Sequence, residues 1–184
     1  MIRQPILEKL CAYKPADDHE SQMLSDIIGF IKDNPNCFER SLLTGHITGS
    51  CWIVNSDYSY TLLIHHYKLD RWLQPGGHCD GDNDVMSVAM KEAEEETGLI
   101  VTPVSDEIFD VDVHTIPSRG DVPEHKHYDI RFLFVADMNA DLLLNKRETK
   151  DIRWVRLEQL QELSTEESLI RMQKKVIELS KMKT

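Results

Sequence analysis

The sequence predicts an α/β (α+β) fold in which helices cover a mixed β-sheet, with a helical appendage at the N-terminus. Strand-like and helix-like segments alternate along the chain, which is typical of a mixed sheet lying between helices. The 184 residues are 41% hydrophobic and 29% charged, which suits one globular unit with a real core plus a short appendage. We therefore expect an appendage over residues 1–40 and the main domain over residues 41–184.

The individual elements follow from periodicity and turn chemistry. An amphipathic helix is expected over residues 17–33, because its apolar residues recur at helical spacing, Asp17 or Asp18 can cap it, and Pro35 ends it. Gly98 suits the left-handed position that ends a second helix. The expected strands are residues 47–54, 60–66, 107–115, 128–136 and 152–155, and the other expected helices are residues 84–97, 157–163 and 166–182.

Charge and composition narrow the function classes. A net charge of −11 argues against long nucleic acids as partners, since these need a basic surface. No apolar run approaches the roughly 20 residues of a membrane span, and no secretory signal is recognisable, so we expect a cytoplasmic protein without a membrane partner. The four cysteines contain no C-x-x-C pair and are expected to be reduced thiols.

An acidic helix end beside a glycine-rich turn is the most informative feature of the chain. Glu92, Glu95 and Glu96 stand at i, i+3 and i+4, so they share one face of the expected helix. Like charges at this spacing repel one another, whereas a helix that only needed solubility would intersperse lysines. Converging carboxylates suit a hard divalent cation, and we expect Mg²⁺, with Mn²⁺ as the alternative. A solvated acidic surface is the competing interpretation.

The segment from Gly76-Gly77-His78 through Lys91-Glu92-Ala93-Glu94-Glu95-Glu96-Thr97-Gly98-Leu99 resembles the Nudix box, G-x5-E-x7-R-E-U-x-E-E-x-G-U, where U is aliphatic. Two positions depart from the pattern: Asn83 stands at the first glutamate, and Lys91 stands at the arginine. Asp82 supplies the first carboxylate if the loop is one residue longer. The similarity extends over about residues 46–163 and implies a Nudix-like α/β/α sandwich.

The resemblance also implies an activity and its residues. The expected reaction is Mg²⁺-dependent hydrolysis of a diphosphate linkage in a small nucleotide-type substrate. The matching family positions give the Gly76 carbonyl, Glu95 and Glu96 as metal ligands, with Glu92 as a further ligand or as the residue that orients or deprotonates the attacking water. Glu148 is a second candidate catalytic residue, because some family members carry a loop glutamate at this place. An ordinary surface role is the alternative for Glu148.

Several aromatic and histidine side chains are candidates for substrate contact. His65 and His78 flank the glycine turn and are expected near phosphate, and Tyr128 is expected to stack on a base, although each of the three also suits a structural role. The pairs His125-x-His127 and Asp112-x-His114 each share one strand face. A zinc site needs three or four ligands, so we favour a substrate pocket or polar strand ends over zinc for these pairs.

Two other functions compete with hydrolysis. One is an isomerase resembling isopentenyl-diphosphate isomerase, which places a catalytic cysteine where this chain has Gly76. The other is a non-catalytic Nudix-like module that binds nucleotides, which the departures at Asn83 and Lys91 would suit. A homodimer through the N-terminal or the last helix is a further alternative to helices that only cover the core. The particular substrate is beyond the sequence, because specificity lies in loops and pocket shape.

Overall fold

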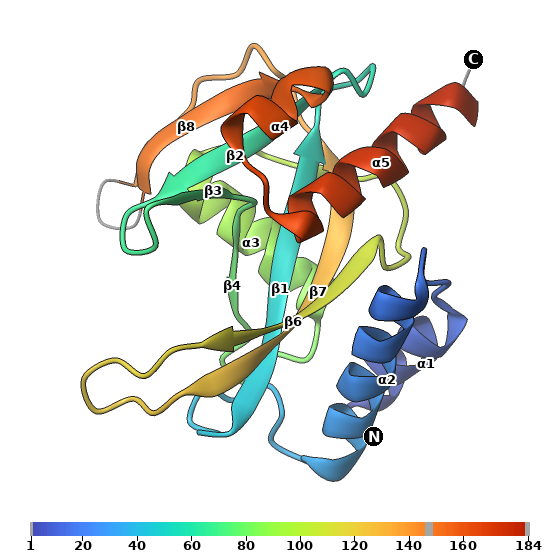
Figure 1. The fold of residues 1–184 in the computed structure, drawn as a ribbon, viewed down its shortest axis with the longest axis vertical. Helices are drawn as coiled ribbons and strands as arrows, with labels where there is room; N and C mark the ends of the chain where they lie inside the picture. Colours follow the sequence, from blue (N-terminus) through green and yellow to red (C-terminus); the bar gives the residue numbers. More distant parts are fainter. Residues whose placement is uncertain (1, 146–148, 183–184) are drawn as a thin grey trace. The chain divides into compact units, whose positions relative to one another are not determined.

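The computed structural model describes residues 2–145 and 149–182, which form the expected α/β fold (Figure 1). The chain makes two compact units, each assembled from distant segments. The first unit comprises Met1–Ser50, Gly76–Ala89 and Asp106–Phe132, and the second comprises Cys51–Pro75, Met90–Ser105 and Leu133–Thr184. Three elements run from the first unit into the second: β1 (Gly45–Val54), α3 (Val85–Thr97) and β7 (His125–Val135).

The sheet is mixed, as expected. Strands β1 and β7 are neighbours and run in the same direction: the Lys126 N–H donates to the Thr44 carbonyl at one end, and the Ala136 N–H donates to the Val54 carbonyl at the other. In the first unit, β4 (Gly76–His78) pairs antiparallel with β1, and β6 (Asp110–Ile116) pairs antiparallel with β7.

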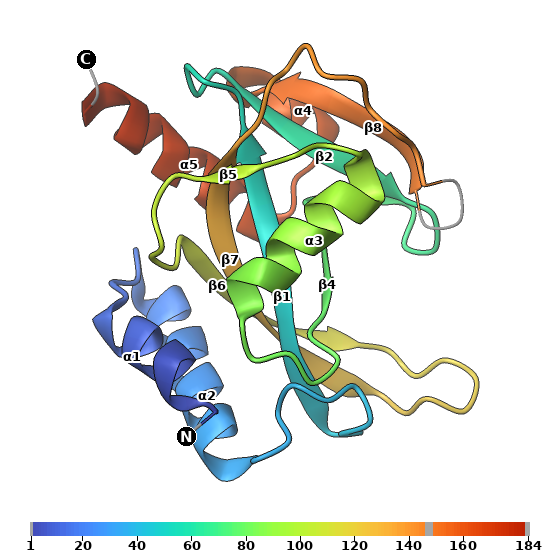
Figure 2. The ribbon, with the colours of Figure 1, turned by 180° about the vertical axis from the view of Figure 1, so that it is seen from behind.

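Two helices belong to the first unit, where α1 (Gln4–Ala12) packs beside α2 (Asp18–Asp33) (Figure 2). The Asp17 side chain caps α2 by accepting from the Glu20 N–H at 2.8 Å, and the buried Glu20 carboxylate accepts from the Ala16 N–H. Helix α1 was missed by the sequence analysis. It is short and buries only two apolar side chains, Ile6 and Leu10, so its periodic signal is weak.

In the second unit, strand β2 (Tyr60–His66) pairs antiparallel with three strands. These are β1, β3 (Arg71–Leu73) and β8 (Thr149–Arg156). The short strand β5 (Thr102–Pro103) pairs with the end of β7. The helical elements are η1 (Leu157–Gln159), α4 (Leu160–Leu163) and α5 (Glu167–Met182), which buries Leu169, Met172 and Val176. In the described part of the chain, none of the helices has the length and apolarity needed to cross a membrane.

Helix α3 begins and ends at capping residues. The Asp84 carboxylate accepts from the Ser87 N–H at 3.1 Å and from the Ser87 hydroxyl at 2.8 Å. At the other end, the Gly98 N–H donates to the Glu94 carbonyl, and Gly98 adopts the expected left-handed conformation with φ of +77°. A methyl group at Gly98 would lie 2.7 Å from Leu143 Cβ, so this end of the helix is closely packed as well as strained.

The four cysteines are free thiols with different surroundings. Cys11 on α1 is exposed, whereas Cys37, Cys51 and Cys79 are buried. Burial raises the pKa of Cys37 to about 11 and also raises that of Cys79 well above its usual value. Cys37 and Cys79 are therefore protonated at neutral pH.

Gly98→Ala should destabilise the protein by roughly 1–2 kcal/mol, the usual cost of a left-handed conformation for an L-residue, and the clash with Leu143 adds to it. Gly29→Ala is the matched control, because nothing lies within 4 Å of an added Cβ in the middle of α2. That change should instead stabilise by roughly 0.5–1 kcal/mol. Urea unfolding of both variants checks the pair, and equal shifts would contradict the assigned helix end.

Candidate active site and polar sheet face

Three glutamates occupy one face of α3, as their spacing predicts. All three lie in the part of α3 that belongs to the second unit. Glu96 is only 5% exposed, Glu92 is half-buried and Glu95 is exposed. The Lys91 Nζ lies 3.5 Å from Glu95 Oε1, an exposed ion pair between residues one helical turn apart. The role of these three glutamates as metal ligands stays a prediction.

The loop before α3 uses its own polar side chains for local structure. Asn83, at the family's first glutamate position, donates from Nδ2 to the Ile2 carbonyl at 3.0 Å and so holds the N-terminal segment. The Asp82 carboxylate accepts from the Asp84 N–H at 2.9 Å. Asp80 forms an ion pair with Arg40. These contacts give Asn83 a structural role that a glutamate, which has no amide donor, could not fill.

Gly76 lies in β4 of the first unit, where it stands directly opposite Ser50 of β1. A Cβ at Gly76 would come within 2.8 Å of Ser50 Cα, so only glycine allows the two strands to approach this closely. The role of its carbonyl as a metal ligand stays a prediction. Glu148 lies outside the described residues, and its catalytic role likewise stays a prediction.

Polar side chains gather on one face of the sheet in the first unit, which we call the polar sheet face. Alternate residues of a strand share a face, and residues opposite one another on paired strands do so too. In the β6–β7 register, His114 stands opposite His127, Asp112 opposite Asp129, and Asp110 opposite Arg131. The polar sheet face comprises His46, Thr48, Ser50, His78, Asp110, Asp112, His114, His125, His127, Asp129 and Arg131.

A buried ionic network holds one end of the polar sheet face. The Arg131 guanidinium lies 2.7 Å from Asp129, 3.1 Å from Asp110 and 3.3 Å from Asp112, and its own side chain is 2% exposed. These carboxylates keep the pKa of Arg131 above its usual value despite burial, so it is charged. Asp129 also accepts from the hydroxyls of Thr48 and Ser50, each at 2.8 Å.

Histidines fill the other end, and we call His46, His78, His125 and His127 the histidine cluster. The His46 ring centroid lies 4.9 Å from that of His78, 5.1 Å from that of His125 and 4.8 Å from that of His127. Burial lowers the pKa of His127 to about 2 and that of His78 to about 4, and it lowers the pKa of His46 as well. These three rings are therefore neutral at pH 7.

The sequence analysis recognised His78, His125 and His127 but missed His46. A signal was available, because His46, Thr48 and Ser50 put polar side chains at alternate positions of an otherwise apolar strand. Arg131 and Asp110 were also missed, whereas Asp112 had been singled out beside His114.

Two predicted substrate contacts already have protein partners. His65 in the second unit stacks on Trp72 with ring centroids 5.0 Å apart, and its Nε2 lies 2.9 Å from Asp70. Tyr128 in the first unit stacks on Phe30 of α2 with centroids 3.9 Å apart. Their roles toward a substrate stay predictions.

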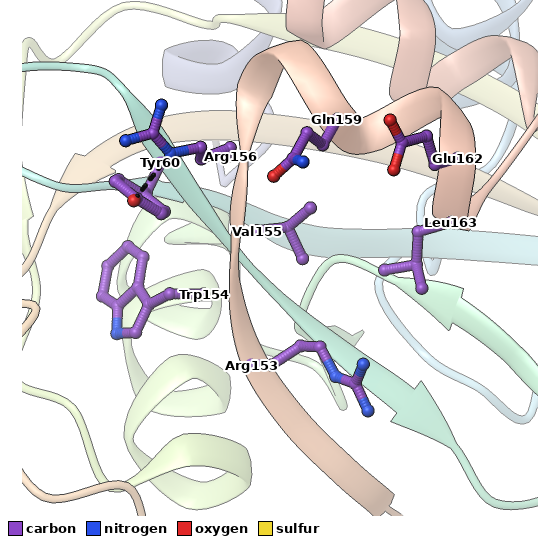
Figure 3. A pocket seen from close by; sticks show the side chains of 8 residues that line it. All are labelled: Tyr60, Arg153, Trp154, Val155, Arg156, Gln159, Glu162 and Leu163. Atoms are coloured by element: carbon purple, nitrogen blue, oxygen red, sulfur yellow. Dashed lines mark hydrogen bonds between the residues drawn. The ribbon is translucent and has the colours of Figure 1, made fainter.

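A shallow pocket of about 390 Å³ lies in the second unit, along β8 and the helices that follow it (Figure 3). Arg156 donates to the Tyr60 hydroxyl at its edge, 2.9 Å away. Arg153 lies 4.5 Å from the centre of the Trp72 ring. The lining residues are Tyr60, Arg153, Trp154, Val155, Arg156, Gln159, Glu162 and Leu163, and none of them is a predicted site residue.

Arg131→Met should lower the free energy of unfolding by roughly 3–5 kcal/mol, because it leaves three carboxylates without the cation that they share. Arg71→Met is the control, since the ion pair of Arg71 with Glu166 is exposed and worth less than about 1 kcal/mol. Chemical denaturation measures both changes. A similar small loss in the two variants would mean that the buried network contributes no more than a surface pair.

Comparison with known proteins places the chain in a family. Residues 45–176 match the NUDIX domain. The mRNA-decapping enzyme subunit 2 of Arabidopsis thaliana is 29% identical over 125 residues, which cover 65% of this chain and 30% of that protein. The chain thus spans less than a third of the length of that relative.

Solved structures agree with this assignment. A NUDIX-family hydrolase from Clostridium perfringens superposes with a TM-score of 0.56 at 26% identity, covering 73% of this chain and 97% of that one. An Ap4A hydrolase from C. elegans gives a TM-score of 0.57 at 18% identity, covering 72% and 96%, and supports the fold alone. Because the domain match covers well over half of the sequence, the chain belongs to the Nudix family.

Proposed function

We propose that the protein hydrolyses a diphosphate linkage in a small nucleotide-type substrate and that Mg²⁺ is required. One observation carries this proposal: Glu92, Glu95 and Glu96 share a face of α3, with Glu96 buried beside the Gly98 cap. Like charges at this spacing repel one another, and a divalent cation among these oxygens would relieve that repulsion.

The donor set fits Mg²⁺ rather than a softer ion. Carboxylate oxygens are the protein ligands that Mg²⁺ prefers, and the glutamates of α3 supply them from one rigid element. When bound, Mg²⁺ supplies positive charge that neutralises the substrate's phosphate oxygens. Mn²⁺ takes similar ligands and is the expected substitute.

The residues of α3 have distinct proposed roles. Glu95 and Glu96 hold the cation, and Glu92 is either a further ligand or the base that accepts a proton from the attacking water. Lys91 keeps Glu95 in place through their 3.5 Å contact, with one point charge instead of a fork of donors.

A small substrate suits the charge of the protein. The net charge of −11 disfavours a long polyanion, while a cation-bridged diphosphate can still bind. One relative is named as a subunit of an mRNA-decapping enzyme, which supports a nucleotide-type compound. The substrate's identity requires a screen.

The screen that tests the function incubates the protein with nucleotide and prenyl diphosphates, with Mg²⁺ or with EDTA, and records product masses. Hydrolysis gives two phosphate-containing products or phosphate itself, whereas an isomerase gives a product of unchanged mass. Tight binding of one compound without turnover would favour the non-catalytic module. Asn83→Glu and Lys91→Arg, which restore the family's residues, would then be the first substitutions to make.

Glu96→Gln should lower the Mg²⁺-dependent kcat roughly 100-fold or more. Changing a residue that only supports a metal ligand costs roughly 10- to 100-fold, and losing a ligand itself should cost at least the upper end of that range. The substitution keeps the side-chain volume, so the fold should survive. Glu94→Gln is the matched control, because Glu94 is exposed on the same helix but lies off the acidic face. Turnover of a folded Glu96→Gln variant at the wild-type rate would remove Glu96 from the ligand set.

Lys91→Arg should preserve or raise kcat, because a guanidinium can hold the Glu95 carboxylate with two parallel bonds. Steady-state kinetics at saturating Mg²⁺ measures the change, with circular dichroism to verify folding. A collapse of turnover in the folded variant would show that Lys91 has a role other than the one proposed here.

A further inference from the structure

The histidine cluster has the composition of a transition-metal site. We infer that His46, His125 and His127 bind a dication of the Zn²⁺ class through their ring nitrogens, using residues distinct from the glutamates of α3. Imidazole nitrogen is a ligand for Zn²⁺, Co²⁺, Ni²⁺ and Cu²⁺, whereas Mg²⁺ prefers oxygen. Three protein ligands and one further position are typical of zinc sites that are open to another molecule.

The three rings are already close enough to converge on one ion. One nitrogen from each of His46, His125 and His127 lies within 4.8 Å of the others. Tetrahedral Zn²⁺ with Zn–N distances of roughly 2.1 Å separates its ligand nitrogens by about 3.4 Å, so the three nitrogens would have to approach one another further to bind one ion. Within the described residues, this is the one group of three or more such side chains with that geometry.

Several ring nitrogens of these histidines are buried with little to bind. The Nε2 of His127 makes no hydrogen bond with any described residue, and at most one of the two buried His46 nitrogens interacts, with the Leu42 backbone. Leaving such a buried polar atom unsatisfied costs roughly 1–3 kcal/mol, so something small should bind there. His46 is only 3% exposed, which admits an ion more readily than the phosphate of a bulky substrate.

The tautomer of His125 suits metal binding. The His125 Nδ1 lies 2.9 Å from the Pro123 carbonyl, which can only accept, so this nitrogen carries the hydrogen and Nε2 keeps its lone pair in the neutral ring. A backbone carbonyl is a common outer partner of metal-binding histidines.

The surrounding charges favour a cation. Arg131 and its three aspartates leave a net charge of −2 on the same sheet face, and Asp129 stands two residues from His127 on β7. Arg40 places a positive charge near His46 and His78, but Arg40 forms an ion pair with Asp80, which offsets that charge. At the edge of the cluster, the His114 Nδ1 lies within hydrogen-bond distance of the Asp112 carboxylate, at 3.0 Å. His78, with its ring centroid 5.1 Å from that of His127, is the nearest candidate for the fourth ligand.

The test uses the full chain without a histidine tag, stripped with EDTA and then titrated with Zn²⁺ against a competing chelator. We expect one tight Zn²⁺ site that excess Mg²⁺ does not displace. His127→Ala should weaken it by more than the roughly 10- to 100-fold that changes in outer partners cause. His19→Ala is the matched control, because His19 is exposed on α2, and it should leave the affinity unchanged.

A second measurement needs no variant and so does not depend on a mutant folding. In the wild-type protein, Zn²⁺ should shift the ring ¹⁵N signals of His46, His125 and His127 and leave those of His19 and His65 unchanged. Shifts confined to surface histidines, or equal Zn²⁺ affinity in wild type and folded His127→Ala, would overturn the inference. Glu96→Gln should retain Zn²⁺ binding, so failure of the hydrolase proposal and failure of this one are distinguishable.

Discussion

The carboxylate of Asp129 is the constraint on which the first unit depends. It accepts hydrogen bonds from Thr48 and Ser50 on β1, and its other oxygen binds Arg131 on its own strand. Arg131 in turn reaches Asp110 and Asp112 on β6. One buried ionic network therefore fixes three strands side by side. Replacing any single member would leave the others with unmet hydrogen-bonding groups.

This network explains why a sheet face can be polar and still be ordered. The hydrophobic effect is non-directional, whereas hydrogen bonds to a buried guanidinium define direction as well as distance. In the histidine cluster, His46 lies on β1 and His125 and His127 lie on β7, two to four residues from Thr48 and Asp129, so these three share this rigidity. Helix α3 achieves order differently: Asp84 and Gly98 fix its ends, and its glutamates follow from the helical repeat.

The sequence predicted those features that depend on local spacing. The acidic face of α3, its glycine cap and the α2 cap at Asp17 all follow from residues within one or two helical turns of each other. Strand ends were harder: β7 begins at His125, three residues before the expected start, because pairing with β6 outweighs the weak strand preference of its polar residues. The histidine cluster joins residues almost 80 positions apart, and single-strand alternation suggested only one pair of them.

One of the four thiols, Cys11, is exposed and the other three are buried, so the protein can be labelled at a single cysteine. A maleimide reacts with the thiolate, so the buried Cys37 and Cys79, with their raised pKa values, should react slowly, and Cys51 is shielded by burial. Cys11 is exposed on α1, beside the helix that carries Phe30 and, through it, contacts Tyr128. A fluorophore attached there would label one helix of the first unit in the otherwise unmodified chain, and its emission could follow how that helix responds to added ligands.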